Sequence, residues 1–302
     1  INPEREVSKA ALRRFAAPST FDVQDFLDGS VRLAGIALDA DCPVLNTPLR
    51  QLTELFSSLR ALVVGVRRAG KLFAPEPGDQ LFEGDHIYVV SESSDLARTL
   101  AIFGKPLAKQ ERIVIIGAGN VGLAVARELE AHPDRIRVKV IERDRARAEE
   151  AADLLERTIV LHGDGMDSEL LLEAGIENAD AVLAVTDDDK TNLLTSVRSK
   201  AMGCKLAISL VNDPSLVPLL DHLGIDAHIN PRATTVSSIL RHVRHGRVRS
   251  IYTVGDGEAE VIEAQVLSTS PLAGRAIANI GFPEGALVGA VKKGGLFVKP
   301  TG

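Results

Sequence analysis

The middle of the chain alternates between short apolar runs and longer segments that mix apolar and polar residues. The apolar runs predict buried strands, and the mixed segments predict amphipathic helices that cover them. Strict alternation of strand and helix is typical of a parallel sheet with crossover helices. We therefore expect a Rossmann-like, doubly wound α/β domain over residues 110–231. Its strands are placed at 112–117, 137–142, 158–161, 181–185 and 206–210, and its helices at 120–131, 145–156, 167–174, 189–202 and 214–223.

The segment before this domain has another pattern and predicts a small α+β module over residues 18–106. Its predicted strands are 20–26, 31–39, 61–73 and 85–91, and its predicted helices are 48–56 and 93–103. Turn chemistry separates them at Pro75–Asp79 and Glu83–Asp85. The module offers no paired carboxylates, activated nucleophile or metal cluster. We expect a regulatory or dimerising module, with Phe73, Phe82 and Tyr88 in its core.

The chain also repeats itself at an offset of 228 positions (229 − 1), with a four-residue shortening later in the second copy. Repeated turn residues, prolines and aromatics in one order indicate a duplicated unit. The matching pairs include Ile1-Asn2-Pro3 with Ile229-Asn230-Pro231, Pro43 with Pro271, Asp28-Gly29 with Asp256-Gly257, and Gly70–Phe73 with Gly294–Phe297.

The repeat predicts which parts of the duplicated unit lie at the two ends of the sequence. Residues 232–302 are expected to form a second small α+β regulatory module, which is incomplete because it has no counterpart to Glu83–Val90. In the second copy the Ile-Asn-Pro tripeptide follows a complete nucleotide-binding half. We therefore expect residues 1–17 to be the trailing helix of a first nucleotide-binding domain that is missing upstream.

A glycine-rich turn follows the first strand of the central domain. Gly117 allows a tight strand-to-helix turn, Gly119 lets the backbone approach a pyrophosphate, and Gly122 lets the next helix pack closely. The pyrophosphate would lie on the helix N-terminus, where unpaired N–H groups and the helix dipole favour negative charge. Glu142 ends the second strand and is expected to accept hydrogen bonds from ribose hydroxyls. The strand, turn, helix and acid together predict a dinucleotide site.

Two further loops follow strands of the same sheet, at the edge where ligands bind in such folds. After the third predicted strand, Asp164 follows Gly163 and is placed to accept a hydrogen bond from an adenine amino group. After the fourth come Thr186, three aspartates and Asn192. The aspartates also fit a helix N-cap, so whether Thr186 and Asp188 face the cleft stays open.

Composition and charge narrow the function classes. A net charge of −6 at pH 7 argues against general nucleic-acid binding. The basic stretch Arg241–Arg249 is interpreted as a solvated helix face or subunit contact, and His242 and His245 lack further ligands for a metal. Cys42 and Cys204 are too few for a disulfide framework. No apolar run reaches the length of a membrane span, so we expect a cytosolic protein.

The motifs, taken in order, resemble a known family. They read IVIIGAGNVG, VKVIERDR, VLHGDGMD, VLAVTDDDKTNLL and LGIDAHINP, and the small half contains GDQLFEGDHIYVV. This series is similar to the regulator-of-potassium-conductance unit of the TrkA family, the cytosolic, nucleotide-binding regulatory subunits of bacterial Trk potassium uptake. The resemblance covers essentially the whole chain, and such proteins carry two tandem units, as the repeat indicates independently.

The resemblance implies regulation without catalysis. It implies a ring, most simply a homotetramer, docked on the cytosolic face of a membrane potassium-translocating subunit. The apolar helix at 214–223 is expected to contribute to subunit contacts. The alternative is an NAD-dependent oxidoreductase, which would need a proton donor beside the nicotinamide. His162 is the one histidine at a strand's carboxyl end, and we interpret it as part of the adenine-side loop.

The ligand is expected to be NAD(H), with ATP or ADP as the alternative. Glu142 disfavours the 2′-phosphate of NADP, and the uncharged Asn120 offers no cation for a γ-phosphate. No catalytic and no metal-binding residues are expected. The predicted cofactor-binding residues are Gly117, Ala118, Gly119, Asn120, Val121, Gly122, Glu142, Arg143, Gly163, Asp164, Thr186, Asp188 and Asn192.

Overall fold

A computed structural model of the chain describes residues 3–56, 59–107, 110–131, 136–220, 222–236, 248–254, 257–298 and 300. Most of the basic stretch Arg241–Arg249, with His242 and His245, and Asp256 of the repeat lie outside the described residues. The chain forms two compact units, which we describe separately. Residues 1–18 and 108–239 make the first unit, and residues 19–107 and 240–302 make the second.

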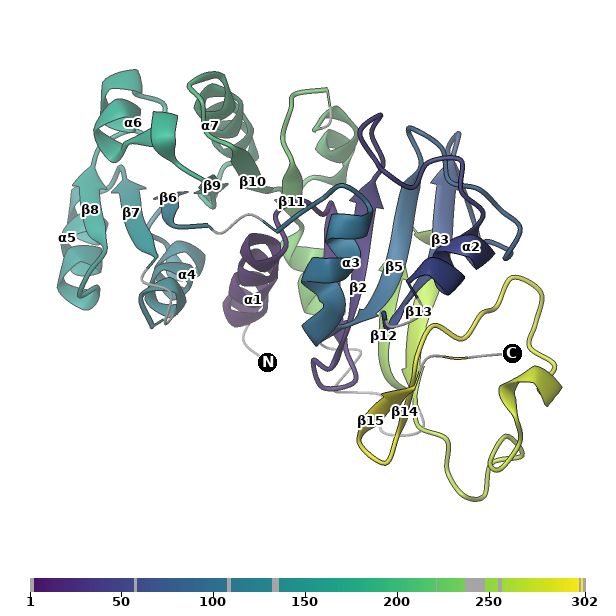
Figure 1. The fold of residues 1–302 in the computed structure, drawn as a ribbon. Helices are drawn as coiled ribbons and strands as arrows, with labels where there is room; N and C mark the ends of the chain where they lie inside the picture. Colours follow the sequence, from purple (N-terminus) through teal and green to yellow (C-terminus); the bar gives the residue numbers. More distant parts are fainter. Residues whose placement is uncertain are drawn as a thin grey trace. The chain divides into compact units, whose positions relative to one another are not determined.

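The first unit is built on a six-stranded parallel sheet with the order β11-β10-β9-β6-β7-β8 (Figure 1). The order reverses at β6, which pairs with β7 on one side and β9 on the other. Such a reversal creates the crevice where doubly wound folds bind ligands. The strands are β6 (Arg112–Ile116), β7 (Arg137–Glu142), β8 (Ile159–His162), β9 (Ala181–Ala184), β10 (Leu206–Leu210) and β11 (Ala227–Ile229).

Both faces of this sheet are covered by helices, as the continuous apolar strands require. On β6, Ile113 and Ile115 belong to one apolar cluster and Val114 and Ile116 to the other. The first cluster includes residues of α4 and α5, and the second includes residues of α6 (Figure 1). The crossover helices are α4 (Asn120–Ala131), α5 (Arg145–Leu154), α6 (Ser168–Ala174) and α7 (Asp189–Ala201).

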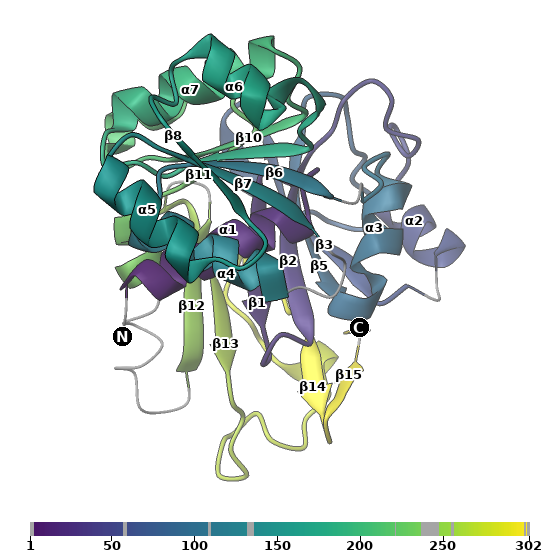
Figure 2. The same ribbon diagram turned by 90° about the vertical axis from the view of Figure 1, so that its left-hand side faces the viewer.

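The N-terminal helix α1 (Pro3–Ala16) is part of this first unit. Its stripe of Val7, Ala11 and Phe15 is buried in the cluster that contains α4. The spacing of four residues puts these side chains on one face of the helix. Figure 2 shows α1 running beside α4 beneath the sheet, and α1 also contacts β11.

The expected fold class is confirmed, with two local differences. Each strand and helix predicted for this unit is present within two residues of its expected ends, except the helix at 214–223. That segment is a 3₁₀ helix, η3 (Pro214–Leu219), which contains Pro218. Proline cannot donate the backbone hydrogen bond that an α-helix needs there. The three-residue strand β11 was not predicted, because three residues are too few to show the apolar pattern of a strand.

The second unit contains a five-stranded antiparallel sheet with the order β1-β2-β5-β3-β4. The predicted strand 61–73 is in fact a hairpin, because Ala69 and Gly70 both have left-handed backbone angles, with φ of 50° and 78°. These angles are typical of a two-residue hairpin turn. Its elements are β1 (Asp22–Phe26), β2 (Val31–Ala37), α2 (Leu49–Leu55), β3 (Ala61–Arg68), β4 (Lys71–Phe73), β5 (His86–Glu92), η1 (Ser93–Asp95) and α3 (Leu96–Ile102).

The second small module forms strands at positions that the repeat relates to the first. Strand β12 (Val248–Val254) and β13 (Ala259–Ala264) pair as β1 and β2 do. Strand β14 (Val291–Lys293) and β15 (Leu296–Val298) form a hairpin whose two turn residues are again left-handed. A short 3₁₀ helix, η5 (Ile277–Asn279), lies 228 positions after the start of α2, at 277 − 49. The two copies therefore share local structure as well as sequence.

An apolar layer joins the two copies within this unit. Val254 of β12 is buried with Leu33 of β2 and Val90 of β5, and Tyr252 and Val261 pack against them. The hydroxyl of Tyr252 donates to the Asp22 carboxylate at 2.7 Å. One copy thus covers the apolar sheet face of the other.

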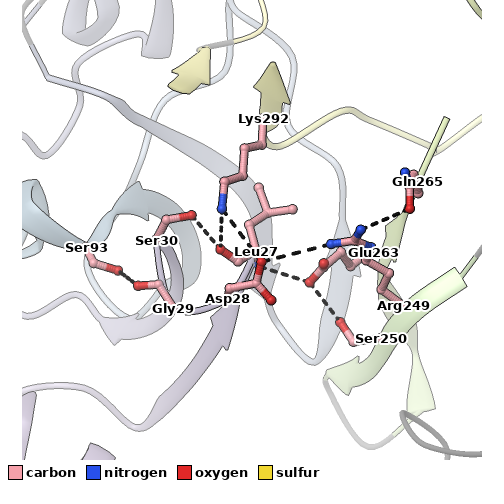
Figure 3. Close-up of polar contacts among 10 residues, drawn as sticks. All are labelled: Leu27, Asp28, Gly29, Ser30, Ser93, Arg249, Ser250, Glu263, Gln265 and Lys292. Atoms are coloured by element: carbon pink, nitrogen blue, oxygen red, sulfur yellow. Dashed lines mark hydrogen bonds and ion pairs between the residues drawn. The ribbon is translucent and has the colours of Figure 1, made fainter. Parts of the chain in front are cut away.

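A polar clamp at the turn between β1 and β2 also joins the copies (Figure 3). Leu27 and Asp28 have φ of 50° and 58°, a strained conformation for residues other than glycine. The Leu27 N–H donates to Glu263 Oε2 at 2.9 Å, and Lys292 Nζ donates to the Leu27 carbonyl at 3.2 Å. Lys292 also lies 3.7 Å from the Asp28 carboxylate. The second copy therefore holds the turn in its strained shape.

The reciprocal contact is present as well. Arg67 of β3 forms a 2.6 Å ion pair with Glu258, which lies just before β13. Lys292 of β14 thus contacts the turn between β1 and β2 in the first copy. Arg67 of β3 contacts Glu258, which lies between β12 and β13 in the second copy. Paired contacts of this kind are typical of a two-fold, self-complementary interface, here built within one chain.

We predict that Glu263→Ala destabilises the protein by about 1–2 kcal/mol, because the half-buried Leu27 N–H loses its acceptor. Urea unfolding measures the change. The matched control is Glu260→Ala, which removes the same charge from an exposed position on β13. Equal midpoints for the two variants would contradict the clamp.

Candidate functional site

The glycine-rich turn lies at the carboxyl end of β6, at the reversal of the sheet order. Gly117 has φ of 104°, and a Cβ built there would lie 3.2 Å from the Thr186 amide and the Val185 carbonyl. A Cβ on Gly122 would lie 2.0 Å from the Gly117 carbonyl oxygen. Only glycine permits this approach, so helix α4 begins directly against the strand exit.

The start of α4 is open toward solvent. A Cβ on Gly119 would meet no atom within 4 Å. Within the described part of the chain, no acceptor is bonded to the N–H groups of Gly119, Asn120 and Val121, whereas Leu123 donates to the Gly119 carbonyl at 2.9 Å. These N–H groups and the dipole of the twelve-residue helix α4 can bind an anion without a lysine.

Glu142 connects the second strand to the glycine-rich turn. The side chain is largely buried, and Oε2 accepts from the Ala118 N–H at 2.7 Å while Oε1 accepts from the Asp144 N–H at 2.8 Å. The carboxylate is therefore fixed at the edge of the anion site. Arg143, the next residue, is exposed.

The loop after β8 carries Gly163 and Asp164. The Gly163 N–H donates to the Glu142 carbonyl at 2.8 Å, which places this loop beside the end of β7. Asp164 is exposed, and its Oδ1 accepts from the Met166 N–H at 2.8 Å. The turn fixes the direction of the carboxyl group while leaving it accessible, which suits contact with a base.

The loop after β9 is held by Asn192. This side chain is fully buried, and its Oδ1 accepts from the Thr186 N–H and hydroxyl at 2.9 and 2.7 Å. Its Nδ2 donates to the carbonyls of Thr186 and Leu210 at 3.1 and 3.0 Å. The hydrogen-bonding groups of Asn192 are thus used by Thr186 and by the end of β10, and its direct contact with a nucleotide remains a prediction.

Asp188 is the N-cap of α7. Its carboxylate accepts from the Thr191 N–H at 2.9 Å and from the Thr191 hydroxyl at 2.5 Å, and these hydrogen bonds lower the pKa of Asp188. The N-cap interpretation therefore accounts for this residue. Asp189 binds the loop after β10 instead, accepting from the N–H groups of Asn212 and Asp213.

One contact at the site was not anticipated. Asn120 Nδ2 donates to Glu4 Oε1 of helix α1 at 2.8 Å. The sequence assigned α1 to a different nucleotide-binding domain, so nothing in the local pattern pointed to this pair. Among the described residues, no group of three or more histidine, cysteine or acidic side chains is arranged to hold a metal ion.

Comparison with known families identifies both parts of the chain. Residues 113–231 match the TrkA-N domain, and residues 33–104 match the TrkA-C domain. The chain is 43% identical over its whole length to the Trk system potassium uptake protein TrkA of Azorhizobium caulinodans, of which it spans 66%. It is 30% identical over 286 residues to the Trk system potassium uptake protein trkA homolog 1 of Methanosarcina mazei, of which it spans 70%.

Two solved structures share the fold. The GsuK RCK domain aligns with a TM-score of 0.53 at 22% identity, covering 80% of this chain and 50% of that one. The GsuK channel bound to NAD aligns with a TM-score of 0.52 at 22% identity, covering 78% of this chain and 41% of that one.

We predict that Gly119→Val abolishes nucleotide binding without lowering the melting temperature. The new side chain meets no protein atom but fills the space in front of the open N–H groups. Gly78→Val is the matched control, because its surroundings are equally open and it lies in the other unit. Calorimetric titration with NADH measures both; normal affinity in Gly119→Val would show that the pyrophosphate lies elsewhere.

A second prediction concerns Glu142. Glu142→Ala should weaken NADH binding by about 1–3 kcal/mol, the range for loss of a charge-assisted hydrogen bond to ribose. Glu142→Gln keeps an acceptor oxygen for the Ala118 N–H, so it separates the ribose contact from the structural one. An unchanged dissociation constant in both variants would remove Glu142 from the ribose site.

Proposed function

The chain belongs to the TrkA family, and we propose that it is the nucleotide-binding regulatory part of a Trk-type potassium uptake system. The observation that supports this most directly is the open α4 N-terminus beside a fixed acid, Glu142. We propose that NAD(H) binds there. Its pyrophosphate would lie on the N–H groups of Gly119, Asn120 and Val121, and its ribose would lie against Glu142.

The choice of NAD(H) has two supports. A carboxylate at the ribose repels the 2′-phosphate of NADP. The GsuK channel, which shares the fold, has been solved bound to NAD. ATP and ADP are the alternative ligands, since the same N–H groups would hold any pyrophosphate. We propose that Arg143, Gly163, Asp164 and Thr186 line the remainder of the site, with Asp188 and Asn192 holding its loops.

Regulation requires that the nucleotide bind two conformations with different affinities. We propose that the chain assembles into a homotetrameric ring and docks on a membrane potassium-translocating subunit from the cytoplasmic side. Within the described residues, every helix is too short or too polar to cross a bilayer. We propose no catalytic role, and assign no residue to proton or hydride transfer.

Assembly has a candidate surface on the first unit. In the segment 214–223, Leu220 is buried and Leu216 and Val217 pack beside it, but Leu219 and Leu223 are 49% and 40% exposed. Leu194 of α7 is 55% exposed. Exposed leucines of this kind are typical of subunit contacts.

We predict that calorimetric titration will detect NADH binding and a weaker response to NADPH. ATP and ADP are titrated in parallel. If none of these ligands binds, the nucleotide-regulated function is wrong.

Consumption of NADH with carbonyl substrates, followed by absorbance, would instead support the oxidoreductase alternative. Regulation itself is measured as a nucleotide-dependent change in potassium flux through proteoliposomes that hold a Trk-type membrane subunit.

Light scattering tests the assembly. We expect a dimer or larger species at micromolar concentrations, and Leu219→Asp with Leu223→Asp should shift it toward monomer by placing charges in an apolar contact. Leu154→Asp is the control, because Leu154 is also exposed but lies on α5, which precedes β8 at the opposite edge of the sheet from β11. A strict monomer for the unmodified chain would contradict the ring.

A further inference from the structure

Helix α1 places a carboxylate at the open start of α4. Glu4 Oε1 accepts from the side chain of Asn120 at 2.8 Å, although the two residues are 116 positions apart in the sequence. Asn120 is the first residue of α4, and its backbone N–H is one of the groups that would hold a pyrophosphate. Only the Asn120 side chain therefore separates the negative charge of Glu4 from the anion site.

The packing of α1 fixes this carboxylate in place. Val7, Ala11 and Phe15 anchor α1 in the apolar cluster that contains α4. Glu4 precedes Val7 by three positions, so it lies on the same face of the helix. The Ser8 hydroxyl also donates to the Glu4 carbonyl at 2.8 Å within this turn. The fold therefore fixes the backbone of Glu4, and the Asn120 amide holds its half-buried carboxylate.

Within the described part of the chain, no lysine or arginine forms an ion pair with Glu4, and the Asn120 amide is a neutral donor. Glu142 contributes a second carboxylate at the turn, bonded to the Ala118 N–H. The helix dipole and N–H groups attract a phosphate, while the two carboxylates oppose each further negative charge.

We propose that Glu4 is a specificity-determining residue that makes this site favour a dinucleotide over nucleoside di- and triphosphates. Each phosphate of a dinucleotide is esterified to a ribose, joined to the other phosphate through an anhydride, and carries one negative charge. The terminal phosphate of ADP or ATP adds charge close to the start of α4, where Glu4 repels it. The inference rests on the proposed nucleotide function and adds a residue from outside the nucleotide-binding half.

The test compares ligands on one variant. Glu4→Gln removes the charge but keeps the size of the side chain and an acceptor oxygen for Asn120. Calorimetric titration with NADH, ADP and ATP should show ATP affinity raised about three- to tenfold, with ADP affected less. NADH affinity should change less than about twofold. Glu4→Lys, which reverses the charge, should raise the affinity for ATP further, again with a smaller effect on ADP and the smallest effect on NADH.

The matched control is Glu6→Gln. Glu6 lies in the first turn of the same helix, loses the same charge and pairs with Lys9 at 3.0 Å. Residues two positions apart do not share a helix face, so Glu6 lies on another face than Glu4. Its ligand preferences should match those of the unmodified chain. Added salt should reduce the difference between Glu4→Gln and the unmodified chain, because salt screens charge repulsion.

The titrations distinguish failure of the Glu4 inference from failure of the proposed nucleotide function. An unchanged ratio of ATP to NADH affinity in Glu4→Gln, or a uniform change for all three ligands, overturns the role of Glu4 while leaving the nucleotide site intact. A uniform change would mean that Glu4 only supports the packing of α1. If the unmodified chain binds none of the three ligands, the proposed function fails and this inference fails with it.

Discussion

The first unit depends on one close approach, that of Gly122 at the start of α4 to the Gly117 carbonyl. A side chain at Gly122 would come within 2.0 Å of that oxygen, so the helix begins against its strand only because both positions are glycine. This contact points the first N–H groups of α4 toward the crevice at the sheet reversal. It also brings the Ala118 N–H to Glu142, and it sets the helix against which α1 packs.

The second unit has a different constraint, which is the apolar face of a small sheet. A five-stranded antiparallel sheet with two short helices cannot cover both of its faces. The second copy supplies the missing cover through Val254, Tyr252 and Val261. The polar clamp at Leu27 then fixes the register of the two copies, since it satisfies a backbone N–H that would otherwise lose its partner.

Helix α1 relates the repeat to the nucleotide site. The repeat matches its first residues to Ile229-Asn230-Pro231, and by packing the helix belongs to the unit that contains the glycine-rich turn. The helix thus contacts the glycine-rich turn of a domain from which the first small module separates it in the chain. Under the proposed function, a nucleotide bound at this turn would be energetically linked to the position of α1, because a ligand that displaces Asn120 also acts on Glu4.

The sequence by itself determined the doubly wound fold, the glycine-rich turn, the acid at the end of β7 and the duplicated small modules. These features depend on local rules: strand and helix periods, the close approach that only glycine allows, and the order of turn residues. The tertiary structure alone decided that the Asn192 side chain bonds to Thr186 and Leu210, and that Asp188 is the aspartate that caps α7. It also decided that α1 packs against α4. It also brought together Leu27 and Glu263, which are 236 positions apart. No local pattern encodes such pairs, because their proximity results from the packing of whole elements whose relative placement is settled only when the apolar faces are buried together.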